Sequence, residues 1–232
     1  MYPNPQRNEA EIVLEGSPAY KGYVLERRSS RTPYLVAKRL MDVMLALVGL
    51  IFLSPLFIMV SLLIKLEDPK GSIFFYQTRV GKDEKPFRMY KFRSMVSNAE
   101  EQLEELLAQN EVRGAMFKMK EDPRITKIGK IIRKTSIDEL PQLWNVIRGD
   151  MSLVGPRPAL PREVEQYSAY DKQRLQVMPG CTGLWQVSGR NNLSFEEMLD
   201  LDLAYIDRRS LWLDVKVMLR TVKVMILPNS AY

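Results

Sequence analysis

With 232 residues the chain is long enough for one well-packed domain with short appendages, and its net charge of +6 suits an anionic partner such as phosphate, lipid headgroups or nucleic acid. The complete absence of histidine excludes Ser–His and Cys–His nucleophile pairs and histidine-based zinc sites, so acid, base or metal chemistry must use carboxylates. Cys181 is the only cysteine, which excludes a disulfide within one chain and a cysteine cluster for zinc or iron–sulfur.

Residues 1 to 37 are predicted to form an N-terminal extension. They mix prolines, charges and short apolar pieces without a helical period, which is typical of a flexible or loosely packed segment. The polar start is not the arrangement of a cleaved secretory signal, so the apolar segment that follows is expected to persist in the mature protein.

A hydrophobic run from Leu40 to Ile64 comes next. At about 1.5 Å per residue, a helix of this length would exceed the roughly 30 Å hydrocarbon core of a bilayer. Ser54-Pro55 interrupts the run, and because proline removes a backbone donor we expect a kink there, with the Ser54 hydroxyl satisfying a freed carbonyl. Basic residues flank both ends, which places both at the cytoplasmic face. The pattern favours a re-entrant membrane helix over residues 38 to 66 rather than an ordinary crossing, and it favours a buried core helix least.

Residues 67 to 232 are predicted to form the main domain, with an α/β, mainly helical fold. Two β-prone runs, Ile73 to Arg79 and Phe87 to Phe92, are joined by the turn-prone segment Gly81 to Pro86 and predict a hairpin. Ser97 to Glu100 has the spacing of a capping box before a helix whose apolar stripe is Leu103, Leu106 and Leu107.

Three further helices are expected. The first, from Ile125 to Lys134, is amphipathic and basic, and its cations face either solvent or a phosphate or anionic lipid. Ser194 to Glu197 begins the second, with Leu199, Leu203 and Ile206 turned inward. The third, Leu211 to Leu227, alternates apolar and charged residues and suits a helix that lies at a membrane interface.

Two adjacent carboxylates, Asp138 and Glu139, stand between the cations Arg133 and Lys134 and a short apolar helical run. Asp138 can serve simply as a helix cap, with Pro141 in the first turn. The alternative is chemical: a carboxylate here is a competent nucleophile toward phosphorus, and a second carboxylate can hold Mg²⁺ against phosphate oxygens. An unperturbed aspartate is already ionised near neutral pH.

Two other segments contain arginines in restricted backbone. In Gly149 to Pro158, the turn Pro156-Arg157-Pro158 presents one guanidinium in a fixed direction, suited to phosphate or to stacking on a base. The segment Pro179 to Arg190 is rich in glycine and is either an anion-binding loop or a pair of turns. Neither matches a Walker A loop or a dinucleotide-binding glycine motif, so a standard nucleotide fold has no support.

These segments, with Lys91 to Met95 and Lys134 to Asn145, resemble in content and order the bacterial sugar transferases, which are monotopic phosphoglycosyl transferases. The resemblance covers about residues 35 to 232. It implies transfer of a sugar 1-phosphate from a UDP-sugar to polyprenyl phosphate, typically undecaprenyl phosphate, with release of UMP. The reaction begins capsule, O-antigen or exopolysaccharide assembly at the cytoplasmic face of the bacterial inner membrane, so the expected partners are these substrates and membrane lipids, not nucleic acid.

The resemblance also implies residue roles. Asp138 corresponds to the covalent nucleophile, Glu139 to a residue that helps to hold Mg²⁺, and Arg133 to a phosphate contact. Ser54-Pro55 corresponds to the kink of the family's re-entrant helix. Arg157 corresponds to a position that binds the nucleotide. The substrate-binding positions other than Arg133 are Lys91, Arg93, Pro156, Arg157, Pro158, Gln186 and Arg190.

The ending Asn229 to Tyr232 and the block Trp185 to Arg190 look most like members that transfer galactose 1-phosphate, with glucose 1-phosphate next. Long members carry additional N-terminal transmembrane helices, so this chain is predicted to be a short form. Its oligomeric state is open, with a homodimer among the options. The competing hypothesis is a membrane-tethered protein whose basic helix engages nucleic acid or lipid without catalysis, but no recognised nucleic-acid module is present.

Overall fold

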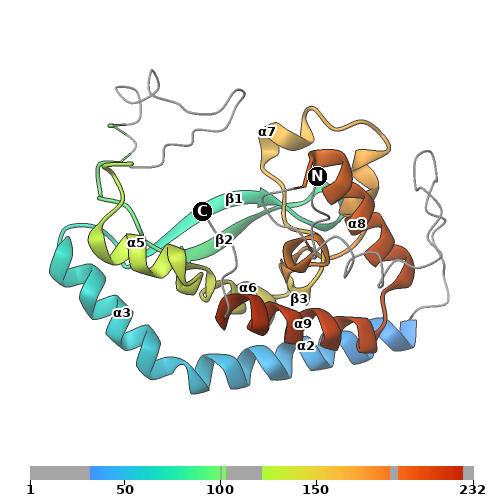
Figure 1. The fold of residues 1–232 in the computed structure, drawn as a ribbon, viewed down its shortest axis with the longest axis horizontal. Helices are drawn as coiled ribbons and strands as arrows, with labels where there is room; N and C mark the ends of the chain where they lie inside the picture. Colours follow the sequence, from blue (N-terminus) through green and yellow to red (C-terminus); the bar gives the residue numbers. More distant parts are fainter. Residues whose placement is uncertain (1–31, 100, 103–121, 189–192, 227–232) are drawn as a thin grey trace, which may run out of the picture. The chain divides into compact units, whose positions relative to one another are not determined.

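The computed structural model describes residues 32–99, 101–102, 122–188 and 193–226 (Figure 1). These residues form two compact units. Unit 1 comprises Met1–Leu50, Gln77–Met89 and Gln142–Tyr232, and unit 2 comprises Ile51–Tyr76 and Tyr90–Pro141, each within the described ranges. The structure is mostly helical with small sheets, which is compatible with the predicted α/β class.

The apolar run forms helices α2 (Thr32–Phe52) and α3 (Ser54–Glu67), which confirms the predicted break. The Ser54 hydroxyl donates to the Ile51 carbonyl oxygen at 2.8 Å, as expected next to a proline. Within the described ranges, no helix is long and apolar enough by itself to cross a membrane; α2 and α3 together meet that test, with a bend of 59° between them. α2 begins inside the predicted N-terminal extension.

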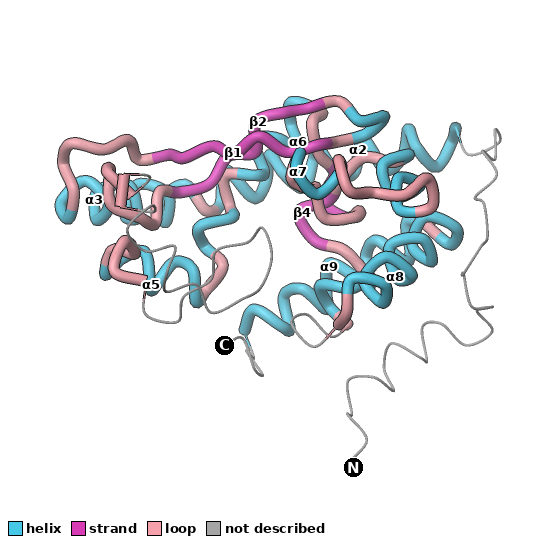
Figure 2. Tube along the Cα trace, turned by 90° about the horizontal axis from the view of Figure 1, so that it is seen from above, coloured by secondary structure: helices cyan, strands magenta, loops and turns pink. Residues whose placement is uncertain are grey.

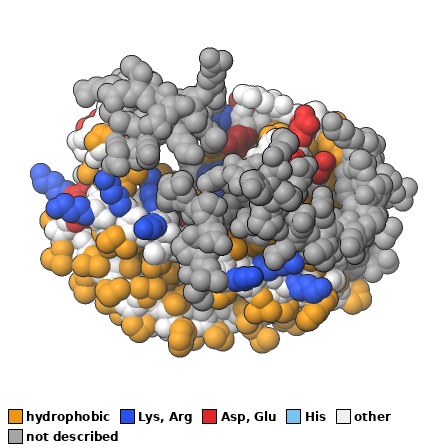
Figure 3. Space-filling view, viewed as in Figure 1, with side chains coloured by type: hydrophobic (Ala, Val, Ile, Leu, Met, Phe, Trp, Pro, Cys, Tyr) orange, Lys and Arg blue, Asp and Glu red, His pale blue; other side chains and the backbone are white. Residues whose placement is uncertain are grey.

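Both helices expose large apolar side chains, and Figure 3 shows such side chains gathered over each of them. Exposed leucine, isoleucine, valine and methionine side chains in this number are unusual on a soluble protein and indicate a surface that another apolar phase covers. On α3 they are Ile58, Met59, Leu62, Leu63 and Leu66. On the part of α2 that belongs to unit 1 they are Leu35, Val36, Leu40, Met44, Leu45, Leu47 and Val48.

The predicted hairpin is confirmed. Strands β1 (Phe74–Val80) and β2 (Pro86–Phe92) pair as a two-stranded sheet, drawn in magenta in Figure 2. The short helix η1 (Lys82–Glu84) connects them, and its positive φ of 54° at Asp83 lets the chain reverse. Of the predicted capping box, Ser97 is described and Glu100 is not, and the apolar stripe of the helix predicted after it falls on residues 103–121, outside the described residues.

The core of unit 2 joins α3, the end of β2 and helix α5 (Lys127–Lys134). Phe92 lies between Phe57 and Phe74, with ring centroids 5.0 and 5.3 Å away, and it packs with Val60, Ile64 and Ile132. The predicted apolar stripe of α5 is only partly inward, since Ile132 is buried but Ile131 is 58 % exposed. The Thr126 hydroxyl accepts the Gly129 N–H at 2.9 Å and thereby caps the helix.

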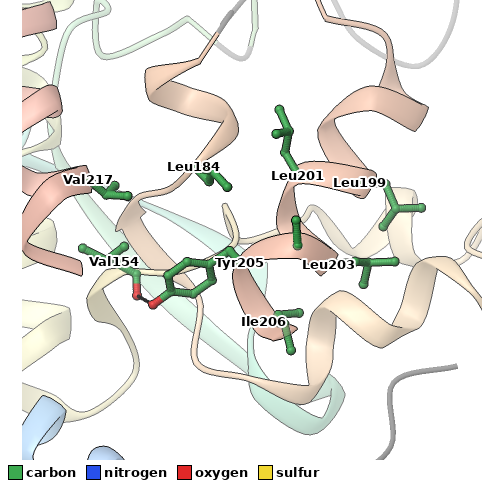
Figure 4. Packing of buried hydrophobic residues seen from close by; sticks show 9 residues of the cluster. Val154, Leu184, Leu199, Leu201, Leu203, Tyr205, Ile206 and Val217 are labelled. Atoms are coloured by element: carbon green, nitrogen blue, oxygen red, sulfur yellow. Dashed lines mark hydrogen bonds between the residues drawn. The ribbon is translucent and has the colours of Figure 1, made fainter. Parts of the chain in front are cut away.

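Unit 1 is built around α8 (Phe195–Arg208) and α9 (Leu211–Ile226). The helix predicted to begin at Ser194 to Glu197 is confirmed, Ser194 and Glu197 form a capping box at its start, and the inward positions predicted on α8 are buried. Figure 4 shows Tyr205 in the centre of this core, where its hydroxyl donates to the Val154 carbonyl oxygen at 3.0 Å. The remaining elements are α6 (Gln142–Arg148), β3 (Ser152–Val154), α7 (Pro161–Val164), η4 (Asp171–Gln176), β4 (Gly180–Thr182) and η5 (Trp185–Val187).

A buried polar network fastens α2 to this core. Asp214 on α9 is 0 % exposed, and its carboxylate accepts hydrogen bonds from Lys38 Nζ at 3.1 Å, Tyr34 at 3.0 Å and Tyr205 at 2.7 Å. A buried carboxylate with three donors is well compensated, because each donor replaces a lost water contact.

A second attachment uses Asp42 and Arg39 of the same helix. The Asp42 carboxylate accepts the Ser152 hydroxyl of β3 at 2.7 Å. Arg39 donates to the carbonyl oxygens of Val146 and Ile147 in the last turn of α6, at 2.6 and 2.9 Å. The N-terminal part of α2 is therefore an integral part of unit 1 and not a loose appendage.

We expect Asp214→Ala to lower the free energy of unfolding by about 3 kcal/mol, because it removes the carboxylate that accepts from the buried Lys38 ammonium and from the Tyr34 hydroxyl. Thermal and denaturant unfolding in detergent, with the exposed Glu165→Gln as control, measures the loss. A change in the Asp214 variant no larger than in the control would contradict this role of the network.

Candidate active site

The strand end Lys91 to Ser94 supplies the side chains on which the unit 2 site is built. Lys91, the residue before the buried Phe92, forms an ion pair with Glu139, with 2.6 Å between Nζ and Oε1. Because side chains alternate along a strand, Lys91 and Arg93 leave the apolar core that Phe92 enters. The structure thus brings the predicted substrate residue Lys91 to the predicted carboxylate pair.

The carboxylates follow α5 through a sharp turn. Ser136 adopts a left-handed conformation with φ of 56°, an uncommon state for serine, and the helix η3 (Ile137–Glu139) follows it. Asp138 lies within η3, whose N-cap residue is Ser136, and α6 begins only at Gln142. Asp138 therefore does not occupy a helix-cap position, which removes the simplest structural explanation for it.

Asp138 is a buried carboxylate beside charges of both signs. It is 8 % exposed. Burial raises its pKa above the ordinary aspartate value; Lys91 opposes this, the Glu139 carboxylate adds to it, and Arg133 opposes it. The aspartate is therefore not the unperturbed group assumed from the sequence. Its ionised form depends on the two cations, which suits a desolvated nucleophile.

Arg133 and Arg93 have different surroundings. Arg133, in the last turn of α5, donates from Nε to the Ser94 hydroxyl at 2.8 Å. The Arg93 side chain is buried and donates to the carboxylate of Asp68 at 3.1 Å and to its carbonyl oxygen at 2.7 Å, at the C-terminal end of α3. Its contacts are therefore those of a helix-end anchor, and its predicted substrate contact stays a prediction.

The Pro156-Arg157-Pro158 segment in unit 1 is held by its own carbonyl oxygens. The Pro156 oxygen accepts the Gly180 N–H at 2.8 Å, and the Pro158 oxygen accepts Arg79 Nη1 at 3.1 Å. The Arg157 oxygen accepts Arg174 Nη2 at 3.3 Å. Three consecutive anchored carbonyls make the backbone rigid, as the flanking prolines predicted.

Arg174 is itself fixed in the interior of unit 1. It forms an ion pair of 2.6 Å with Asp202 and donates to the Tyr167 hydroxyl at 2.9 Å. Burial raises the pKa of Asp202 to about 6, which the Arg174 guanidinium opposes. The sequence analysis did not identify Arg79, Arg174 and Asp202 as supports of the segment around Arg157. Their contacts with it arise only through long-range packing, and no local motif indicates them.

The two glycine-containing motifs of unit 1 meet as parallel strands. β3 pairs with β4 in the register Ser152 to Gly180 and Val154 to Thr182. A Cβ on Gly180 would lie 2.1 Å from the Gly155 amide nitrogen, so this contact requires glycine. The segment from Pro179 therefore begins as a strand and not as the predicted loop or turn pair. Gln186 in η5 donates to the Cys181 carbonyl oxygen at 3.3 Å, and Arg190 lies outside the described residues.

A family model described as bacterial sugar transferase matches residues 33–228, so the chain belongs to this family. It is 49 % identical over 225 residues to the galactosyl transferase CpsE of Streptococcus agalactiae serotype III, covering 97 % of this chain and 50 % of that protein. It is 45 % identical to an undecaprenyl-phosphate galactose phosphotransferase of Salmonella typhimurium, over 90 % of this chain and 43 % of the relative.

An undecaprenyl-phosphate glucose phosphotransferase of Komagataeibacter xylinus is 38 % identical, over 90 % of this chain and 39 % of the relative. The chain thus spans about half the length of these relatives or somewhat less. The family resemblance predicted from the motifs is confirmed, and all three relatives are named as transferases.

Because the Lys91 charge stabilises the ionised form of Asp138, we expect Lys91→Met to raise the pKa of that carboxyl further. A ¹³C-carboxyl NMR titration of labelled protein measures the change, and the exposed Lys70→Met is the matched control. An Asp138 pKa that is unchanged in the Lys91 variant, or that moves equally in the control, would show that the lysine does not act on this carboxyl.

Proposed function

We propose that the protein transfers a sugar 1-phosphate from a UDP-sugar to undecaprenyl phosphate, with release of UMP, as the first membrane step of capsule, O-antigen or exopolysaccharide synthesis. Family membership and the names of the relatives support the reaction class. The observation that carries the proposal to this chain is the buried Asp138 with Lys91 and Arg133 as its nearby cations.

The chemistry is two displacements at one phosphorus. An ionised Asp138 oxygen attacks the phosphorus next to the sugar, the bond to the bridging oxygen breaks, and UMP leaves with that oxygen. A phosphate oxygen of undecaprenyl phosphate then attacks the same phosphorus, the bond to Asp138 breaks, and the carboxylate is restored. Splitting the transfer in this way lets a single site serve a soluble donor and a lipid acceptor in turn.

The cations of unit 2 offset the negative charge that accumulates in these steps. Arg133 offers a planar fork that matches phosphate oxygens, and Lys91 offers a point charge. The Lys91 ion pair with Glu139 holds the ammonium close to the reacting carboxylate before the donor arrives. Lys91 therefore both stabilises the ionised nucleophile and adds positive charge where phosphate groups bind.

The carboxylate pair fits Mg²⁺. No group of three or more metal-binding side chains occurs among the residues whose placement is described. Mg²⁺ nevertheless binds typically through one or two carboxylates together with substrate phosphates, and Glu139 would supply such a carboxylate beside the nucleophile. Glu139 is the residue we expect to hold the ion, in which case its carboxylate would bind Mg²⁺ in place of the Lys91 ammonium. When bound, Mg²⁺ would neutralise charge on the phosphate oxygens.

The exposed apolar helices support a membrane location. We propose that α2 and α3 form a re-entrant element that enters the bacterial inner membrane from the cytoplasmic face and returns, since basic residues flank both ends. α9 exposes Trp212, Leu219 and Val222, and Lys216 lies 5.2 Å from the Trp212 ring centre. Tryptophan beside lysine on an amphipathic helix is typical of the interface between headgroups and acyl chains.

Galactose 1-phosphate is the transferred group that the relatives favour. Two relatives named for galactose are 49 % and 45 % identical to this chain, and a relative named for glucose is 38 % identical. Glucose 1-phosphate is the alternative. The block from Trp185 that suggested galactose in the sequence forms η5 over Trp185–Val187.

We expect Asp138→Asn to reduce UMP release by at least about a thousandfold, because an amide oxygen is a poor nucleophile toward phosphorus. Assays in detergent with UDP-sugar, undecaprenyl phosphate and Mg²⁺ test this, with Asp171→Asn as the control. Mass spectrometry of wild-type enzyme incubated with donor alone should show a sugar-phosphate adduct on Asp138. Near-normal turnover in Asp138→Asn would refute the nucleophile assignment.

A donor panel tests the sugar. With UDP-galactose, UDP-glucose and their N-acetyl forms, we expect UMP release to be fastest from UDP-galactose. Faster release from UDP-glucose would support the alternative sugar. No turnover with any donor, together with salt-sensitive binding of nucleic acid, would instead support a non-catalytic binding protein.

A further inference from the structure

Ser94 is a polar residue of unit 2 to which the proposed mechanism gives no role. It follows the end of β2 and is 8 % exposed, so its hydroxyl is largely removed from water. The hydroxyl oxygen accepts a hydrogen bond from Arg133 Nε at 2.8 Å. A hydrogen bond that a charged guanidinium donates is among the stronger ones in proteins, and this one restricts the rotation of the arginine head.

The backbone holds Ser94 and α5 in one register. The Thr126 N–H donates to the Ser94 carbonyl oxygen at 3.2 Å, immediately before the helix begins. A Cβ on Gly129 would lie 2.0 Å from that same oxygen, so this close approach of α5 to the strand end requires glycine. The position of the Ser94 hydroxyl relative to Arg133 is therefore set by the fold.

The first turn of α5 has a second attachment. Both oxygens of the Glu67 carboxylate accept N–H groups from the first turn of the helix, at 2.6 Å from Lys127 and 3.0 Å from Ile128. These contacts fasten α5 to the end of α3 and satisfy amides that lack partners within the helix. α5 is thereby a rigid support for the arginine in its last turn.

The hydrogen bond between Arg133 and Ser94 determines which edge of the Arg133 guanidinium is available to a ligand. A guanidinium can bind an anion through the pair Nε and Nη or through the pair Nη1 and Nη2. In Arg133 the Nε donor is already committed to Ser94. Among the described residues, no acceptor is bonded to its two terminal nitrogens. The end-on pair is therefore the pair that remains for a phosphate group.

We propose that Ser94 is a positioning residue, which orients Arg133 so that its two terminal nitrogens bind the donor phosphate that Asp138 attacks. This inference rests on the proposed function and adds to it a residue that acts through Arg133. A purely structural role for Ser94 would stabilise the fold equally whatever residue occupies position 133.

A double-mutant cycle on the full chain distinguishes the two roles. We expect Ser94→Ala to lower kcat/KM for the UDP-sugar about tenfold, because a misoriented guanidinium loses part of its bidentate contact. We expect Arg133→Lys to lower kcat/KM about a hundredfold, because an ammonium has neither the fork nor an Nε group. In the Arg133→Lys background, Ser94→Ala should then change kcat/KM by less than about twofold.

Controls separate loss of orientation from loss of fold. Ser61→Ala removes another hydroxyl of unit 2, one that donates to the Phe57 carbonyl oxygen in α3, and should leave kcat/KM within about twofold of wild type. Melting temperatures are measured for all variants. Should Ser94→Ala fail to fold, Ser94→Cys keeps the volume but offers a weak acceptor, and it enters the cycle instead.

The outcomes are distinct. A tenfold loss for the Ser94 variant that persists in the Arg133→Lys background, or a Ser94 variant as active as wild type, would overturn the positioning role and leave the proposed function intact. Wild-type protein that releases no UMP from any UDP-sugar would overturn the proposed function, and this inference with it. Loss of activity only where Arg133 is present would establish the role.

Discussion

The chemistry proposed here depends on a carboxylate that is buried and still ionised. Removing Asp138 from water opposes its charge, and the nearby cations Lys91 and Arg133 favour it. Both cations are held by neutral or anionic partners of their own, Ser94 and Glu139. The reacting group is therefore supported by a preformed electrostatic environment, which costs no rearrangement at the moment of reaction.

The segment from Lys91 to Ser94 organises unit 2, because its consecutive side chains contact four different parts of the unit. Lys91 reaches Glu139, Phe92 enters the aromatic core, Arg93 holds the end of α3, and Ser94 orients Arg133. α3 belongs to the proposed re-entrant element. The segment from Lys91 to Ser94 therefore contacts both that element and the carboxylate site. A change at any of these positions is therefore transmitted to more than one part of the unit.

In unit 1, as in unit 2, buried polar and charged groups are paired with one another. The carbonyl oxygens around Arg157 accept from Gly180, Arg79 and Arg174, and Arg174 is in turn held by Asp202. Asp214 joins the N-terminal part of α2 to the centre of the unit. These charges are retained in the interior because each has a partner, and an unpaired one would be strongly destabilising.

The sequence by itself determined the break at Ser54-Pro55, the hairpin, the capped helix after Ser194 and the family, because each depends on local backbone chemistry or on contiguous motifs. It also pointed to Asp138 and Glu139 as the carboxylate pair. Only the tertiary structure decided that Asp138 is buried outside a cap position and that Arg93 donates hydrogen bonds to the C-terminal end of α3. It also decided that Arg174 donates to the backbone of Arg157. Desolvation and pairing arise between residues distant in the chain, and no local pattern encodes them.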